Sequence, residues 1–96
     1  MEKYNFEWVE GNKHKSVLKH GITNIEAESV FCDSKLKIFF DTKHSHFENI
    51  YICIGKSGLK RIIVTAFTIR NEKYRIISSR IANKKLNLLY ESTSVK

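Results

Sequence analysis

The sequence predicts an α+β domain in which an antiparallel sheet of four to five strands packs against two N-terminal helices and one C-terminal helix. Strand-like segments, rich in β-branched and aromatic residues, occupy the chain between residues 36 and 79. Helical patterns occur on both sides of this block. Short loops join the later strands, and loops of that length form antiparallel hairpins. Helices segregated from a run of strands are typical of the α+β class.

The N-terminal third is expected to hold one short strand followed by two helices. Residues 4–8 alternate apolar with polar side chains, as a short strand does. Residues 12–20 have a helical pattern, and Gly21 suits the left-handed conformation that ends many helices. A second helix is expected over residues 24–31, because Thr23 is followed three residues later by a glutamate, which is the spacing of a capping box.

Four strands and one helix are expected in the remainder of the chain. No proline interrupts these segments, since the sequence contains none. A helical spacing of leucines returns after residue 80, with Asn83 as the expected N-cap. Residues 92–96 are expected to fray at the end of this helix. The four expected strands cover residues 36–40, 51–54, 60–68 and 73–79.

A chain of 96 residues is expected to form one domain over residues 1–96, because two separate cores would not fit. Its two cysteines exclude a disulfide framework and a four-cysteine zinc site. Cys32 and Cys53 lie in apolar stretches, which favours buried, reduced thiols in a cytoplasmic protein. No apolar run has the length of a membrane helix and no secretory signal is visible, so no membrane partner is expected.

Positive charge is concentrated in the second part of the chain. The formal net charge is +7. Residues 1–54 contain seven basic and eight acidic side chains, whereas residues 55–96 contain ten basic and two acidic ones. All four arginines fall in this second part. Such a field attracts polyanions, and the charge alone leaves nucleic acid, an acidic protein and an anionic membrane surface open as partners.

The segment from His44 to Glu48 contains two histidines and a carboxylate. Metal binding is one interpretation, but the His-x-His spacing is not a zinc signature and no third ligand is evident. We therefore expect no metal and no other cofactor. His44 suits general acid–base chemistry because imidazole titrates near neutral pH, and Glu48 is a second proton-transfer residue. A solvated loop histidine is the alternative interpretation.

Arg75 and Arg80 enclose an Ile-Ile-Ser-Ser segment that reads as a strand. On a regular strand, five positions place two side chains on opposite faces, unless Arg80 already lies beyond the strand end. An arginine beside a hydroxyl at a strand end suits phosphate contact. Arg70, at the neighbouring hairpin, is placed to reach the same anion. Separate surface arginines are the alternative interpretation.

Three further residues are predicted to contact RNA. Tyr51 belongs to a set of aromatic residues that interleave with the basic part of the chain, a pattern that holds single-stranded RNA by stacking and charge neutralisation. Aromatic residues in strands more often belong to a core, and that alternative stays open. Lys19 and Arg61 are predicted as additional cations. Lys19 also sits where a helix end favours positive charge.

A set of short motifs occurs in a characteristic order between residues 6 and 91. In chain order they are Phe6-Glu7-Trp8, Asn12, Lys19-His20-Gly21, Ile25-Glu26-Ala27, Val30-Phe31, His44-Ser45, Glu48, Tyr51-x-x-Ile54-Gly55, Thr68, Arg70, Arg75-Ile76-Ile77-Ser78-x-Arg80-x-Ala82 and Tyr90-Glu91. This ordered set resembles the BrnT family of toxins from type II toxin–antitoxin systems. Each motif is short, so the specificity lies in their order over nearly the whole chain.

The resemblance implies a RelE-like fold and an endoribonuclease toxin that cleaves RNA and stops translation. It also implies a cognate BrnA-type antitoxin, a hetero-oligomer of the two, and binding of operator DNA by that complex. Two positions depart from the family pattern. Ile50 stands where an arginine is expected, and Ile69 stands where an acid is often found. Loss of that arginine either attenuates the enzyme or shifts its work to Arg61 or Arg70.

From these residues we expect metal-independent RNA cleavage. Arg80, together with Arg75 or Arg70, would hold the phosphate, while His44 or Glu48 would transfer protons. Two other classes of function stay open. One is a non-catalytic basic module that binds nucleic acid, and the other is a basic interaction protein for an acidic partner.

Overall fold

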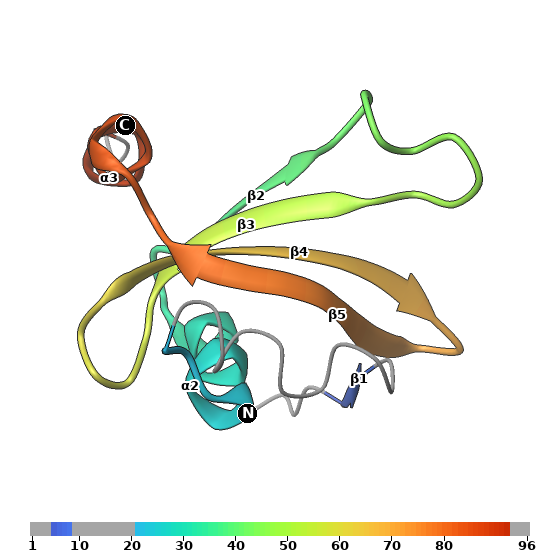
Figure 1. The fold of residues 1–96 in the computed structure, drawn as a ribbon, viewed down its shortest axis with the longest axis horizontal. Helices are drawn as coiled ribbons and strands as arrows, with labels where there is room; N and C mark the ends of the chain where they lie inside the picture. Colours follow the sequence, from blue (N-terminus) through green and yellow to red (C-terminus); the bar gives the residue numbers. More distant parts are fainter. Residues whose placement is uncertain (1–4, 9–20, 93–96) are drawn as a thin grey trace.

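The computed structural model describes residues 5–8 and 21–92 (Figure 1). A five-stranded sheet carries one helix on each side, which confirms the α+β class. The helix predicted over residues 12–20 lies outside the described residues. In chain order the elements are β1 (Phe6–Trp8), α2 (Asn24–Ser29), the 3-10 helix η2 (Val30–Cys32), β2 (Lys37–Phe40), β3 (Tyr51–Lys56), β4 (Ile62–Arg70), β5 (Lys73–Ile81) and α3 (Lys84–Glu91).

The strand order is β1-β5-β4-β3-β2, and the sheet is mixed. Strands β2 to β5 pair antiparallel, as their connections predict. Strand β1 pairs parallel with β5, so the prediction of a fully antiparallel sheet is wrong at this strand. No turn dictates its direction, because β1 and β5 are far apart in the chain. Ring contacts hold it instead, with the Phe6 centroid 5.1 Å from that of Phe31 and 5.9 Å from that of Tyr74.

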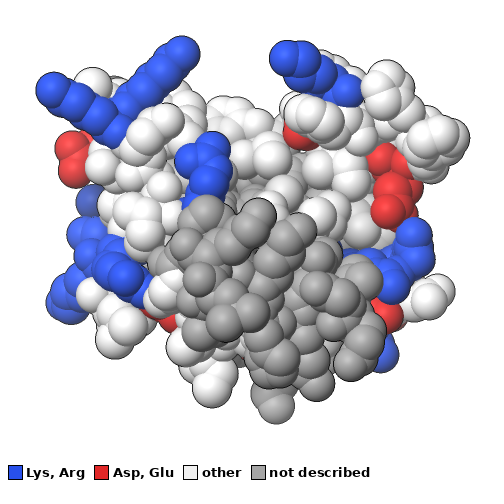
Figure 2. All heavy atoms as spheres, in the orientation of Figure 1, with Lys and Arg blue, Asp and Glu red and all other residues white. Residues whose placement is uncertain are grey.

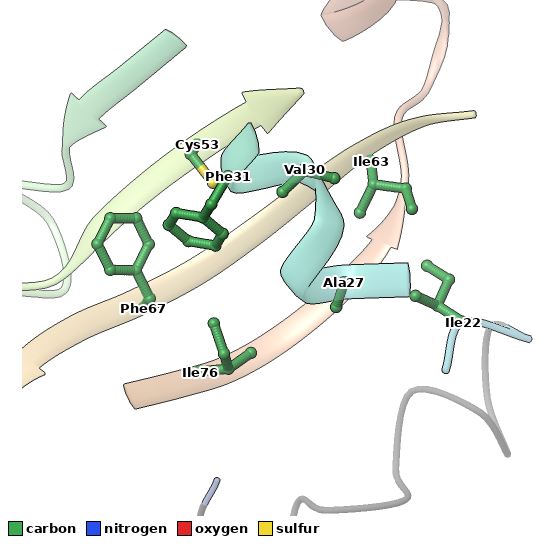
Figure 3. Packing of buried hydrophobic residues seen from close by; sticks show 8 residues of the cluster. All are labelled: Ile22, Ala27, Val30, Phe31, Cys53, Ile63, Phe67 and Ile76. Atoms are coloured by element: carbon green, nitrogen blue, oxygen red, sulfur yellow. The ribbon is translucent and has the colours of Figure 1, made fainter. Parts of the chain in front are cut away.

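One face of the sheet packs against α2 and η2 and contains the main core (Figure 3). Helix α2 begins as predicted, with the Thr23 hydroxyl accepting a hydrogen bond from the backbone N–H of Glu26 at 3.1 Å. The segment that contains Leu36 lies very close to β3 at Gly55. A Cβ on Gly55 would lie 2.8 Å from Leu36 Cδ1. A larger residue at position 55 would force Leu36 to move and would crowd the Val30 carbonyl, at 3.1 Å. The core residues are Ile22, Ala27, Val30, Phe31, Cys53, Ile63, Phe67 and Ile76.

Helix α3 covers one end of the other face. The predicted N-cap is present, because the Asn83 side chain accepts a hydrogen bond from Leu86 N at 2.9 Å. The buried Tyr90 packs with Ile54 and Val64 of the sheet. No described helix covers the rest of this face (Figure 1). Within the described residues, no helix is long and apolar enough to cross a membrane.

Candidate functional site

A β-bulge brings the two strand arginines to the same side of the sheet. The register between β4 and β5 shifts by one residue at Ile77, so β5 carries an extra residue there. As a result, Arg75 lies opposite Thr68 and Arg80 lies opposite Val64. Those partners are four positions apart on β4, and side chains four apart on a strand share a face. Arg75 and Arg80 therefore share a face, whereas a regular strand would have separated them.

We call this side of the sheet the arginine face. It is the face that α3 covers at one end, since Val64 packs in the cluster that contains Tyr90. Arg80 is exposed and Arg75 is partly buried. Arg75 Nε is buried without a hydrogen-bond partner among the described residues. A buried donor without a partner costs free energy.

A hollow of about 360 Å³ opens on the arginine face, at the foot of the loop between β2 and β3. Aliphatic side chains from three neighbouring strands and their ends form most of its lining. The small side chain of Ala66, on the central strand, leaves the space. The lining residues are Asp41, His44, Ile50, Ile52, Ala66 and Ile77.

His44 is held at the rim of this hollow by a carboxylate. Its Nδ1 lies 2.8 Å from Asp41 Oδ2. Asp41 also accepts hydrogen bonds from the backbone N–H groups of Lys43 and His44, at 3.1 and 3.3 Å. The His44 hydrogen bonds, foremost the side-chain one, hold the pKa of Asp41 below its usual range. With Nδ1 engaged, Nε2 is the ring nitrogen left to face a ligand.

Ser45 closes the loop on which His44 sits. The backbone N–H of Ile50 donates to Ser45 Oγ at 2.9 Å, and Ser45 Oγ in turn donates to the Asp41 carbonyl. Both ends of the loop are thereby tied together. Residue 50, where the family pattern has an arginine, is the aliphatic Ile50, and its side chain lines the hollow together with His44.

Arg70 and Glu48, both predicted as site residues, lie close together and form an ion pair with each other. Arg70 Nη2 donates to Glu48 Oε1 at 2.6 Å, and both side chains are substantially exposed. Exposed ion pairs contribute about 0–1 kcal/mol, so an anionic ligand can displace this one at little cost. In the described state the carboxylate of Glu48 orients Arg70.

Arg61 lies elsewhere, at the junction of α2 with the β3–β4 hairpin. Its Nε donates to Glu26 Oε2 at 2.8 Å, a second guanidinium nitrogen bonds Glu26 Oε1, and the same nitrogen donates to the Gly21 carbonyl at 3.1 Å. The guanidinium is therefore engaged by the fold. Its role in binding RNA stays a prediction.

Tyr51 lies on the face opposite to the arginines. Its ring stacks on Phe67, with centroids 5.6 Å apart, and makes an edge contact with Phe40 at 5.6 Å. It packs against the core under α2. An RNA-stacking role for Tyr51 stays a prediction, and it would act on a different surface from Arg75 and Arg80. Lys19 lies outside the described residues.

On the side of the molecule that Figure 2 shows, the charged side chains of the described residues do not gather in one patch. In the view of Figure 2, lysine and arginine side chains are spread around the outline of the molecule, with acidic side chains among them. Charge in this view therefore does not single out a site, and the candidate site rests on the local geometry of the arginine face. Among the described residues, no three His, Cys, Asp or Glu side chains gather where they could hold a metal ion.

Asp41 is a polar residue of the candidate site that the sequence analysis did not single out, and the aliphatic lining residues Ile52 and Ala66 were not singled out either. A signal for Asp41 exists, because an aspartate that begins a tight loop often accepts hydrogen bonds from the backbone two residues later. That arrangement holds Asp41 in place and leaves its second oxygen for His44.

Comparison with known proteins shows where this fold belongs. A family model described as the ribonuclease toxin, BrnT, of type II toxin–antitoxin systems matches residues 8–85. A similar fold is found in the 1.1 Å crystal structure of the Brucella abortus ribonuclease toxin BrnT, with a TM-score of 0.62 and 22% sequence identity. The alignment covers 85% of this chain and 100% of that one. A comparison with curated proteins found no match.

These findings define the class as an RNA-cleaving toxin. The chain belongs to the BrnT ribonuclease toxin family of type II toxin–antitoxin systems, because the family model covers most of its length. It is an endoribonuclease by this membership, and membership also implies a cognate antitoxin partner. The family inferred from the ordered motifs is confirmed.

Proposed function

We propose that the chain cleaves RNA without a metal ion at the arginine face. One observation carries this proposal: the bulge in β5 puts Arg75 and Arg80 on the same face as a hollow whose rim holds His44, oriented by Asp41. Phosphate-binding and proton-transferring groups thus share one surface. That combination is what cleavage at a ribose 2′-oxygen requires.

The proposed reaction is a transfer within the RNA strand. His44 Nε2 takes the proton of the 2′-hydroxyl, and the 2′-oxygen attacks the adjacent phosphorus. The bond to the 5′-oxygen breaks, and this oxygen takes up a proton from solvent. The products are a 2′,3′-cyclic phosphate and a free 5′-hydroxyl. Arg75 and Arg80 offset the negative charge that develops on the phosphoryl oxygens in the transition state.

Arg70 and Glu48 have a secondary place in this scheme. Because Glu48 is paired with Arg70 in the described state, we assign proton transfer to His44. Arg70 lies on the same face of β4 as Thr68, the partner of Arg75, and its guanidinium becomes available to the RNA backbone when the exposed pair opens.

Arg80→Ala is the first test. We expect roughly a hundredfold or greater loss of cleavage of a defined RNA in the presence of EDTA. Removal of one donor that stabilises transition-state charge has an effect of this size in other enzymes. Lys35→Ala is the matched control, since it removes one positive charge from an exposed turn before β2, outside the strands that carry the arginines. Retained cleavage by Arg80→Ala removes this residue from the site.

The same assay separates the alternative functions. A non-catalytic basic module would bind RNA with an affinity that falls steeply with salt, and wild type and variant alike would leave it uncut. The aliphatic residue at position 50 favours a slower enzyme rather than an inactive one, because Arg75 and Arg80 remain available on the arginine face.

The biological consequences follow from the family. We infer that cleavage of messenger RNA inhibits translation in the cytoplasm, that a BrnA-type antitoxin neutralises the toxin in a hetero-oligomer, and that this complex binds operator DNA. Family membership supports these points. Growth arrest on expression, relieved by co-expression of the neighbouring antitoxin gene, is the expected result. Harmless expression of the folded chain would count against the toxin role.

A further inference from the structure

We propose that the hollow on the arginine face is a subsite for one unpaired nucleobase of the RNA substrate. This inference rests on the proposed function and adds a specificity-determining site to it. The base would lie against the sheet between the His44 loop and strand β5. Its ribose and phosphate would then reach the arginines and the imidazole, so the subsite would place the scissile bond.

The lining fits a heteroaromatic base better than a phosphate. Ile52, Ala66 and Ile77 form an aliphatic floor across three adjacent strands. Asp41 and His44 supply hydrogen-bonding atoms at the rim only. An apolar floor with few polar groups at one edge is the usual composition of a small-ligand site, and a base is flat, apolar on its faces and polar on its edges.

The neighbouring edge strand adds an exposed aromatic ring. Phe39 on β2 pairs with Ile52 on β3, so both side chains lie on the arginine face. Phe39 is 41% exposed, although it is a large apolar residue. Exposed aromatic rings beside a basic groove are where proteins stack the bases of single-stranded nucleic acid. Phe39 is thus placed to stack a base that enters the hollow from the solvent side.

The two arginines of this face favour RNA as the occupant, even though Glu7, the register partner of Arg75, also lies on it. Arg75 and Arg80 stand on β5 on either side of the bulge that contributes Ile77 to the hollow. A polyanion with a projecting flat base satisfies both the cations and the apolar floor. An apolar peptide segment would satisfy the floor alone. We therefore commit to RNA, and a protein occupant becomes one outcome of the test.

Another hollow among the described residues lacks these features. A space of about 460 Å³ lies on the α2 side, lined by Thr23, Ile25, Glu26, Ser29, Gly58 and Leu59. Its one carboxylate, Glu26, is already occupied by Arg61 and Ser57. No arginine lines it that could meet a phosphate.

The test uses RNA oligonucleotides that carry a 2′-fluoro substitution at every position, which removes the nucleophilic 2′-oxygen while keeping an RNA-like sugar conformation, and a single abasic site moved along the strand. Binding to the full-length protein is measured. We expect the abasic site to lower affinity roughly tenfold at one position, the size of a lost base-stacking contact. In Ala66→Leu, whose larger side chain fills the hollow, and in Phe39→Ala, this position dependence should disappear.

Phe40→Ala is the matched control. Phe40 is the next residue on the same strand and is similarly exposed, at 48%, but it lies on the opposite face. It should keep the full position dependence. Should Ala66→Leu not fold, Phe39→Ala alone still decides, because its exposed ring contributes little to the core.

The outcomes separate this inference from the proposed function. Position-dependent binding without cleavage of the matching ribo-oligonucleotide by wild type would support the subsite and overturn the proposed reaction. Cleavage with no position dependence, or dependence that Phe39→Ala and Ala66→Leu both retain, would overturn the subsite. Loss of antitoxin binding in Ala66→Leu with unchanged RNA binding would also overturn it, in favour of a protein occupant.

Discussion

Glu26 shows how a single side chain joins helix α2 to a hairpin that lies far from it in the sequence. Its side chain is 5% exposed and receives hydrogen bonds from Arg61 Nε at 2.8 Å and from Ser57 Oγ at 2.6 Å. The hydrogen bond from Arg61, which outweighs the effect of burial, holds the pKa of Glu26 below its usual value of 4.5. This carboxylate therefore joins helix α2 to the β3–β4 hairpin in its ionised form.

Glu26→Gln is expected to destabilise the protein by about 1–3 kcal/mol at neutral pH, because it leaves buried donors without a full partner. A carboxyl with a lowered folded-state pKa stabilises above its unfolded pKa, and this contribution is lost as pH falls through the folded value. The difference between wild type and variant should therefore shrink below about pH 4.5. Urea denaturation at several pH values measures it, with Glu48→Gln as the exposed control.

Asp41→Asn tests the orientation of the imidazole. An amide in place of the carboxylate removes the charged acceptor that lies 2.8 Å from His44 Nδ1. We expect cleavage to fall by roughly tenfold or more, because a wrongly oriented imidazole is a poor base even when the fold is intact. Thermal denaturation should show little change, since His44 is exposed. If the melting temperature falls so far that unfolding accounts for the lost cleavage, Asp41 has a structural role only.

At the scale of elements, the β5 bulge and the docking of α3 shape the arginine face. The bulge sets which side chains point to it, and α3 closes one end. Helix α3 is anchored by Tyr90, whose hydroxyl donates to Asp33 Oδ2 at 2.6 Å. Burial and this hydrogen bond raise the pKa of Tyr90 to about 12. The contact joins the last helix to the segment after η2, across 57 residues of sequence.

Tyr90→Phe should destabilise the protein by about 1.5–3 kcal/mol, the range for a hydrogen bond to a charged group. A group with a raised folded-state pKa stabilises below its unfolded value, so wild type should lose this advantage as pH rises from about 10, the ordinary tyrosine value, to about 12. Chemical denaturation at pH 7 checks the first effect. Leu88→Ala, at a 60% exposed position on the same helix, should change stability much less.

At the scale of the whole molecule, a cluster of aromatic rings joins three parts of the chain. Phe67, on the central strand, contacts the rings of Phe31, Tyr51 and Tyr74 with centroid distances of 5.2, 5.6 and 5.6 Å. Helix η2, strand β3 and strand β5 thus meet at one buried side chain, which is 1% exposed.

Phe67→Ala is expected to cost about 3–5 kcal/mol, from lost burial together with the cavity left behind. Small domains have only about 5–15 kcal/mol of stability, so much of the variant should be unfolded at 37 °C. Circular dichroism against temperature measures the change. Phe47→Ala is the control, since Phe47 is fully exposed and its removal should change stability by about 0.5 kcal/mol or less.

Local patterns in the sequence determined the α+β class, the four antiparallel strands, the caps at Thr23 and Asn83, and the ordered motifs that identify the family. These features depend on neighbouring residues, which is why a one-dimensional pattern carries them.

Three features depend on tertiary contacts and could not be predicted from the sequence. The direction of β1 depends on rings from distant segments. The side to which Arg80 points depends on a bulge that only the pairing with β4 defines. The role of Arg61 depends on Glu26, a partner 35 residues away. For β1 and Arg61 the deciding contacts join residues far apart in the chain, and for Arg80 the deciding contact is the register of a strand pair. Neither kind of contact exists before the sheet has formed.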